Sequence, residues 1–290
     1  MLLTRSLVAQ VNWRSPLNNK LAFWCLTFPG KNYNSQNWRD ICKTTLGATG
    51  GANAPYSGIL GNGAWFSGNR PPGGFGSIGF DGSNDQVDFL NLSQFNALAE
   101  IGVSCWMWSQ QTTADACLVC KGTTASASSV WTLWQDDVGA TSGRTDTISF
   151  KVSSGASETR VEGSTGLIGT NKWIHVLATW RQTTEKIVLY INGIQDQADT
   201  IKNAVTMASQ SVTVRVGRSG TGTLPHNGFI ESPRIWTKYI DADTAWAIYQ
   251  DAITGYKETL NFGSYRNLAA KAAAASTKKV PIYHLISGTM

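Results

Sequence analysis

The sequence contains few of the residues from which catalytic centres and metal sites are usually built. Only three histidines and five cysteines occur among 290 residues. An odd number of cysteines in a chain of this length does not indicate a disulfide framework. Cys117 and Cys120 have the spacing of half a zinc site, but no second pair of ligands accompanies them, and structural zinc needs four. We therefore predict that these are buried strand cysteines.

Charged residues and long apolar runs are also scarce. Charged residues make up 15% of the chain, and the net charge is +5. Residues 255–290 hold five basic residues and one acidic residue, so the rest of the chain is nearly neutral. Such a chain lacks the broad cationic surface of nucleic-acid-binding proteins. No run approaches the ~18 apolar residues that span a bilayer, and residues 1–16 do not resemble a secretory signal. We expect neither nucleic-acid binding nor membrane insertion.

Glycine and tryptophan are abundant, with 29 and 12 residues, and short alternating runs fill most of the chain. The run 101–109 places Val103 and Met107 on one face and Trp106 and Trp108 on the other. A second pair of runs, 173–180 and 187–194, ends in Asn192-Gly193, a strong hairpin signal. Short alternating runs separated by turns predict an all-β sandwich.

One short helix and two flanking segments complete the predicted organisation. Residues 241–253 have helical spacing of apolar side chains, with Asp241 or Asp243 as a candidate N-cap. We expect an N-terminal arm over residues 1–16, a sandwich domain over 17–254 and a basic tail over 255–290.

Six segments follow one another in a fixed order: 21–24, 80–87, 103–106, 119–122, 173–193 and 216–236. Together they resemble the laminin-G-like, concanavalin A-like family. The resemblance implies a two-sheet antiparallel jelly-roll sandwich that binds rather than catalyses. Where the family usually has an acidic pair, this chain keeps only Glu231, and Pro233 removes a backbone donor. We therefore expect the strand around Pro233 to be bulged or at a sheet edge.

Residues 11–30 and 248–256 are similar to sandwich proteins of phage and prophage gene sets. This resemblance implies a structural protein of the virion, a capsid decoration or a tail- or fibre-associated protein, or otherwise an extracellular surface protein. Its partners would be other virion proteins or copies of itself. The basic tail offers candidate docking residues, namely Lys271, Lys278, Lys279 and Tyr283.

Four tryptophans are candidates for glycan binding, because sugars stack on exposed aromatic faces. They are Trp106, Trp108, Trp131 and Trp134. If they lie on an outer face, the protein presents a glycan platform to a host surface, or it is a free lectin-like module. If they lie between the sheets, they are core residues. Alternation alone leaves both interpretations open.

The turn after Phe80 is a weak candidate for calcium binding, since calcium prefers hard oxygen ligands in loops. Its candidate ligands are Asp81, Asn84, Asp85 and Asp88. The alternative is an Asx-rich turn, in which these side chains bond to the backbone. No other cofactor is expected.

The sequence lacks the paired carboxylates that a sandwich-fold glycosidase requires. Such enzymes place two carboxyl groups about 5 to 9 Å apart across the sugar bond. Asp136 and Asp137 are adjacent and would point to opposite faces of a strand. Glu158 and Glu162 are too far apart along one strand to form a tight pair. We therefore predict that the protein is not an enzyme.

Overall fold

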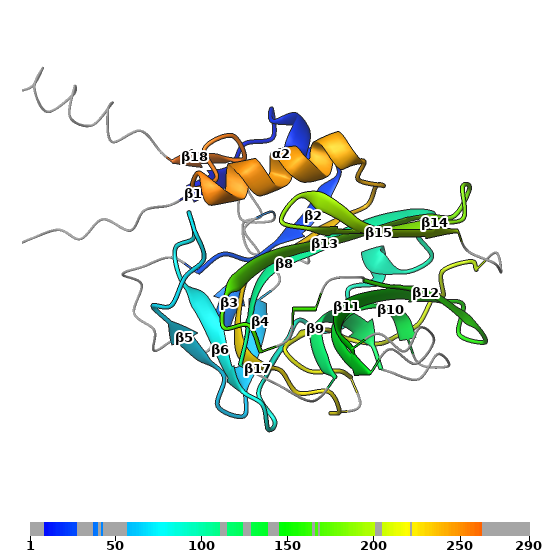
Figure 1. Ribbon diagram of the computed structural model, residues 1–290, viewed down its shortest axis with the longest axis horizontal. Coiled ribbons are helices and arrows are strands. Elements are labelled where there is room, and N and C mark those ends of the chain that lie inside the picture. Colours follow the sequence, from blue (N-terminus) through cyan, green and yellow to red (C-terminus); the bar gives the residue numbers. More distant parts are fainter. Residues whose placement is uncertain are drawn as a thin grey trace, which may run out of the picture.

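Two antiparallel β-sheets packed face to face form the body of the molecule (Figure 1). This computed structural model describes residues 9–27, 37–39, 42, 57–110, 115–123, 129–138, 145–163, 166–167, 169–200, 205–220 and 222–262. The predicted all-β sandwich is confirmed. Among the described residues, no helix combines the length and the apolar composition that crossing a bilayer requires.

The first sheet has the strand order β15–β14–β13–β8–β17–β6–β5, and β2 also pairs with β17. The bounds of these strands are β2 Leu21–Trp24, β5 Trp65–Ser67, β6 Ser77–Asp81, β8 Glu100–Ser109, β13 Trp173–Arg181, β14 Lys186–Ile191, β15 Ile194–Thr200 and β17 Asn227–Trp236.

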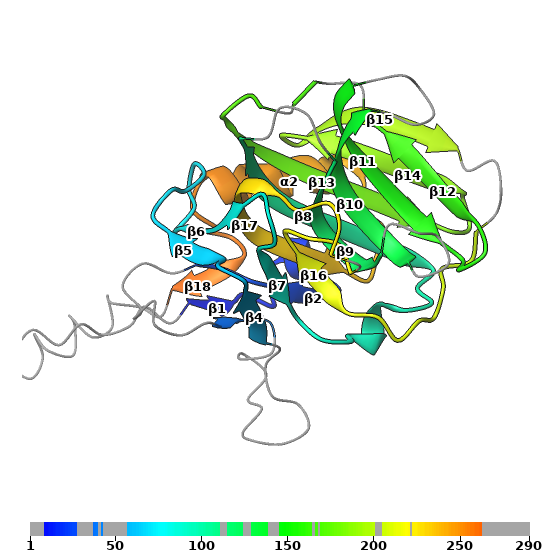
Figure 2. The ribbon, with the colours of Figure 1, turned by 90° about the horizontal axis from the view of Figure 1, so that it is seen from below.

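The second sheet has the strand order β12–β11–β10–β9–β16–β7–β4–β3. The bounds are β3 Asn37–Arg39, β4 Ser57–Gly61, β7 Gln86–Asp88, β9 Ala116–Gly122, β10 Ser129–Val138, β11 Thr145–Ser153, β12 Glu158–Glu162 and β16 Val214–Val216. Figure 2, seen from below, shows this sheet in front of the first.

The main core lies between the two sheets, where alternation along each strand turns every second side chain inward. Val103, Cys105 and Met107 of β8, which share one face of the strand, all point into it. Trp131 of β10 and Trp180 of β13 fill it from opposite sheets, and neither side chain is exposed.

A second apolar cluster covers part of the outer face of the first sheet. The helix α2, Ala242–Ile253, lies across this face (Figure 1). Of the two candidate caps, the structure selects Asp241, whose side chain accepts a hydrogen bond from the Thr244 amide at 2.8 Å. The strands β1, Ala9–Val11, and β18, Leu260–Phe262, pair beside it. The described strands therefore lie beyond both ends of the expected 17–254 domain.

Two 3-10 helices, η1 Pro16–Asn18 and η2 Ser93–Phe95, are the remaining elements of the described residues.

The predicted hairpin joins β14 to β15. Both Asn192 and Gly193 have positive φ angles, 51° and 79°, as a type I′ turn requires.

The predicted irregularity near Pro233 is a bulge in a central strand. The register of β17 against β8 shifts between Glu231 and Arg234, and Ser232 adopts φ 53°. Before the bulge β17 pairs with β6, and after it with β2. The bulge thus supplies the irregularity that Pro233 needs inside a sheet.

Candidate functional site

An aromatic row crosses the outer face of the first sheet, beyond the part that α2 covers. Trp173, Trp108 and Phe229 stand opposite one another on β13, β8 and β17. Their rings are close neighbours: the centroids of Trp108 and Trp173 are 5.9 Å apart, and those of Trp173 and Phe229 are 6.5 Å apart. Strand pairing alone produces this alignment, because directly opposed residues share a face. All three side chains are partly exposed.

Trp65 extends the row to the edge strand β5. Gly79 of β6 stands opposite both Phe229 and Trp65. A methyl group on Gly79 would lie 2.3 Å from the Trp65 indole, so the glycine allows the indole to lie close against the sheet. The centroids of Trp65 and Phe229 are 6.2 Å apart, and Trp65 is 42% exposed. We call Trp173, Trp108, Phe229 and Trp65 the aromatic row.

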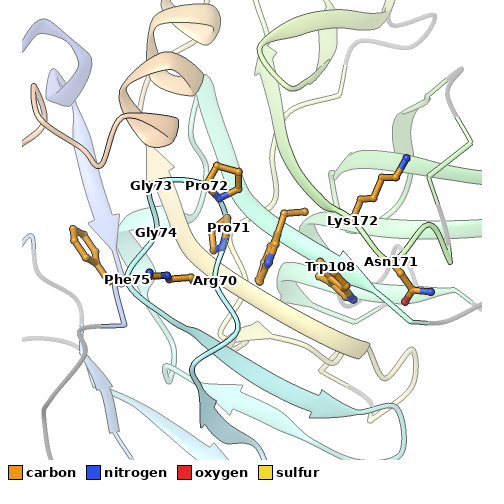
Figure 3. Close-up of a pocket in the computed structure, with 10 residues that line it drawn as sticks. Arg70, Pro71, Pro72, Gly73, Gly74, Phe75, Trp108, Asn171 and Lys172 are labelled. Carbon is orange, nitrogen blue, oxygen red and sulfur yellow. The ribbon is translucent and has the colours of Figure 1, made fainter.

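A cleft of about 810 Å³ opens beside Trp108 and Trp173. The loop 70–75 forms one side of it, and Asn171 and Lys172 stand on the other, next to Trp108 (Figure 3). The cleft combines aromatic surface with a few polar groups, which is the usual composition of a ligand site.

The loop wall of the cleft is fixed to the rest of the molecule. The Gly74 amide donates to the Pro71 carbonyl at 2.9 Å, which closes a tight turn. Gly73, at φ 72°, packs so closely against the end of α2 that a methyl group there would lie 2.2 Å from the Ala252 carbonyl oxygen. The Trp173 indole N–H donates to the Asn69 side chain at 3.2 Å. Loop, helix and aromatic row therefore hold one another in place.

The four tryptophans predicted for glycan binding do not form one platform, and this corrects that interpretation. Only Trp108 belongs to the aromatic row. Trp106 shares its face but lies 1% exposed beneath α2, with its ring 5.9 Å from that of Tyr249. Trp131 is in the core between the sheets. Trp134 has the opposite parity and lies 6% exposed on the outer face of the second sheet.

Sequence reasoning missed three members of the aromatic row, namely Trp173, Phe229 and Trp65. The first two lie in segments that carry the family resemblance, but their opposition to Trp108 depends on strand pairing over distances of 65 and 121 residues along the chain. The only indication in the sequence was the alternation of each strand, because each of these three residues is next to a side chain that faces the core and therefore points outward itself.

The calcium candidates extend from one sheet to the other, although the side chains of Asp81 and Asp85 are close enough to interact. Asp81 ends β6 in the first sheet and Asp88 ends β7 in the second, so the turn connects the sheets rather than closing a hairpin. Asp81 accepts from the Ser83 amide at 2.8 Å, and buried Asp85 accepts from the Asp81 amide at 2.9 Å. Burial raises the pKa of Asp85. These are the contacts of an Asx-rich turn.

Asp88 and Asn84 have their own partners. Asp88 forms an ion pair with Arg215 at 3.0 Å, and the backbone carbonyl of Asn84 accepts from the side chains of Asn62 and Arg218. In the part of the chain that the structure describes, no three acidic, histidine or cysteine side chains are grouped as a metal site would require.

The remaining predicted sites have two different outcomes. Cys117 and Cys120 are buried, unpaired cysteines of β9, as expected, and burial raises the pKa of Cys117 well above its usual value. The candidate docking residues Lys271, Lys278, Lys279 and Tyr283 lie outside the described residues.

Apart from these predicted sites, a group of polar and aromatic side chains is buried under α2, at the bulge of β17. The Tyr256 hydroxyl donates to the Glu231 carboxyl at 3.0 Å, and the Arg234 guanidinium stacks 3.9 Å from the centre of the Trp24 ring. Burial raises the pKa of Glu231 to about 8 and lowers that of His175 to about 3. All five side chains are at most 2% exposed. This group supports the fold and offers no surface to a ligand.

A family model described as the concanavalin A-like lectin/glucanases superfamily matches residues 81–244, which is more than half of the chain. The chain belongs to this superfamily. The resemblance seen in the sequence is therefore confirmed. No curated protein sequence matches the chain.

Solved structures share the superfamily fold with this chain at low sequence identity. The binding domain of Paraclostridial Mosquitocidal Protein 1 is 12% identical, with a TM-score of 0.58 over 80% of this chain and 52% of that one. The binding domain of botulinum neurotoxin DC, solved in complex with SialylT, is 13% identical, with a TM-score of 0.53 over 81% and 52%. The chain thus spans about half of each domain.

The superfamily name includes glucanases, and the structure brings two carboxylates onto one outer face. Glu162 of β12 stands opposite Ser149 of β11, whose hydroxyl donates to Asp136 of β10 at 2.8 Å. Sequence reasoning missed this approach because 26 residues separate the two acids. Arg160 pairs with Glu162 at 2.6 Å. Burial raises the pKa of Asp136, and the Ser149 hydrogen bond partly opposes it.

Proposed function

We propose that this chain is a non-enzymatic carbohydrate-binding module of the concanavalin A-like superfamily. The observation that carries the proposal is the aromatic row: four aromatic side chains aligned across five strands on the uncovered part of the first sheet. The adjoining cleft, with the loop 70–75 as its wall, completes the site.

The row suits a sugar because the C–H groups of a pyranose ring stack on aromatic faces, while nearby polar side chains orient its hydroxyl groups. Asn171 lines the cleft beside Trp108 and is exposed. The row runs across strands that are about 4.8 Å apart, so it offers several successive stacking positions. An extended oligosaccharide therefore fits it better than a single small sugar.

The fold comparisons support the proposal in a limited way. One structural relative is a neurotoxin binding domain whose complex with SialylT was solved, and another neurotoxin structure concerns interaction with two ganglioside molecules. At 13% identity these likenesses show the fold alone. The assignment of the sugar site rests on the aromatic row of this chain.

A glycan array tests the proposal. We expect the full chain to retain a defined set of oligosaccharides, and Trp173→Ala to lose most of that binding, because half-exposed tryptophans are typical binding hot spots worth about 2 kcal/mol. Chelation of calcium should leave the binding unchanged. Absence of binding across the array, or full binding by Trp173→Ala with an unchanged circular dichroism spectrum, would contradict the proposal.

A hydrolase is the second candidate, favoured by the approach of Asp136 and Glu162. Both carboxylates have partners, Ser149 and Arg160, whereas a glycosidase needs an acid and a base that can exchange protons with the substrate. We therefore expect no release of reducing sugar from β-glucans. Turnover that disappears in Asp136→Asn and in Glu162→Gln would establish the hydrolase instead.

A virion location remains a prediction that rests on the sequence resemblance of residues 11–30 and 248–256. The fold comparisons contain nothing that supports it. Mass spectrometry of purified phage particles from the strain that encodes the chain would test it. We expect stoichiometric peptides from the chain, and their absence beside abundant capsid peptides would refute this location.

A further inference from the structure

The cleft beside the aromatic row is positively charged. Ten residues line it, and they include Arg70 and Lys172 but no aspartate or glutamate. Figure 3 shows the two cations on different sides of the cleft, Arg70 with the loop 70–75 and Lys172 beside Asn171. Both residues are exposed. In Figure 3 the Arg70 guanidinium lies toward Phe75 and the Lys172 amino group points away from Trp108, so each of these exposed side chains must turn to meet a ligand that lies along the cleft.

Among the described residues, no acidic side chain forms an ion pair with either cation. The described residues form ion pairs elsewhere, such as Arg181 with Glu100 and Arg215 with Asp88, but no such pair includes Arg70 or Lys172. Two cations without a described ionic partner, placed beside the cleft, lower the electrostatic energy of an anion that binds there. A neutral sugar would use the tryptophans and gain little from either charge.

We propose that the cleft selects oligosaccharides that carry a carboxylate or a sulfate group. This inference rests on the proposed carbohydrate-binding function and names its ligand class. The aromatic row holds the sugar rings by stacking, and Arg70 and Lys172 hold the anionic substituents. An arginine can also form two parallel hydrogen bonds to a carboxylate or sulfate, which adds geometric selectivity.

The wall that carries Arg70 is positioned before a ligand arrives. Asn69, its neighbour, accepts from the Trp173 indole, and the Ser77 hydroxyl donates to the Asn69 carbonyl at 2.6 Å. Pro71, on the other side of Arg70, is buried and has a fixed φ angle. A backbone held on both sides of Arg70 reduces the entropy lost on binding.

Two matched pairs of probes test the inference, measured by isothermal titration with the full chain. The carboxylate arm compares a hyaluronan hexasaccharide with its carboxyl-reduced form. The sulfate arm compares a neocarrageenan tetrasaccharide with its desulfated form. We expect the acidic member of at least one pair to bind about tenfold more tightly than its neutral partner, and this preference to shrink as salt rises from 50 to 500 mM.

Variants separate this inference from the function on which it rests. Arg70→Gln and Lys172→Gln should each weaken acidic binding roughly 2- to 5-fold, as exposed charge pairs allow, and should leave neutral binding unchanged. Lys186→Gln, an exposed lysine at the start of β14, is the matched control and should behave like the wild type. Equal binding of acidic and neutral partners would overturn the inference and leave the binding function standing. If neither pair of probes binds, an array of neutral and acidic glycans tests the inference instead. Retention of neutral glycans alone on that array would also overturn the inference.

Discussion

Trp65 and Trp246 have nearly the same exposure, 42% and 46%, but different surroundings. Trp65 ends the aromatic row on β5, whereas Trp246 lies on α2 with its ring 5.8 Å from that of Tyr249. We expect Trp65→Ala to weaken oligosaccharide binding about tenfold, because it removes one stacking position. Trp246→Ala should bind like the wild type. Equal losses in both variants, measured by titration, would show that the row is not the site.

Glu231 makes the stability of the protein depend on pH in an unusual direction. Burial raises its pKa from 4.5 to about 8, and the Tyr256 hydrogen bond and the Arg234 charge oppose this only in part. The folded state therefore holds a proton that the unfolded state releases between these two pKa values. The stabilisation by this proton is complete below pH 4.5 and is lost as the pH rises through 8.

We therefore expect the free energy of unfolding of the wild type to fall between about pH 5 and 8, by up to about 1.4 kcal/mol per pH unit, and to level off above pH 8. Glu231→Gln keeps an acceptor for the Tyr256 hydroxyl and should remove this slope. Glu258→Gln, which changes an exposed acid two residues after Tyr256, is the control. Urea titrations across this pH range measure the slopes, and a wild-type slope in Glu231→Gln would assign the effect to another group.

At the scale of elements, α2 does more than cover the sheet, because it also positions the wall of the cleft. The contact depends on Gly73, which has a positive φ and no space for a side chain against Ala252. Gly68 precedes the same loop, and nothing lies within 4 Å of the position that a methyl group would take there. Alanine substitutions at Gly73 and Gly68 can therefore be compared to test whether the position of the loop 70–75 affects oligosaccharide binding.

We expect Gly73→Ala to lower the free energy of unfolding by about 1 to 3 kcal/mol, since it combines strain at positive φ with a backbone clash. Because the loop must move away from α2, oligosaccharide binding should also weaken several-fold. Gly68→Ala should change neither property appreciably. Thermal denaturation and titration measure the two effects, and wild-type binding by a destabilised Gly73→Ala would show that the wall is dispensable.

For the whole molecule, the ends of the described chain contribute to the second apolar cluster. Val11 and Leu260, on the paired strands β1 and β18, are 2% and 3% exposed, and Tyr256 is fully buried. The first residues of the expected basic tail, through 262, therefore pack against the body of the molecule.

A pair of truncations tests this boundary. The fragment 1–262 should unfold cooperatively near the temperature of the full chain, because every described element remains. The fragment 1–254 should lose several kcal/mol of stability, because it lacks Tyr256, Leu260 and the strand that pairs with β1. Calorimetry of the two fragments decides, and equal melting temperatures would place the boundary at 254 after all.

The amino-acid sequence by itself determined the fold class, the shared face of Val103 and Met107 on β8, the Asn192-Gly193 hairpin, the capped helix over residues 241–253 and the irregular strand at Pro233. Each of these follows from local chemistry: alternation, turn conformation, capping and a missing backbone donor. The same local rules identified Trp108, but they could not separate it from Trp106, which has the same parity.

Only the tertiary structure decided which tryptophans meet a ligand and which acids approach one another. Trp106 and Trp108 differ because α2 covers one and stops short of the other. Trp173, Phe229 and Trp65 join Trp108, and Glu162 approaches Asp136, through pairings between strands that are distant in sequence. The register of paired strands and the part of the sheet that α2 covers both depend on the packing of the whole chain. A local sequence pattern therefore cannot predict them.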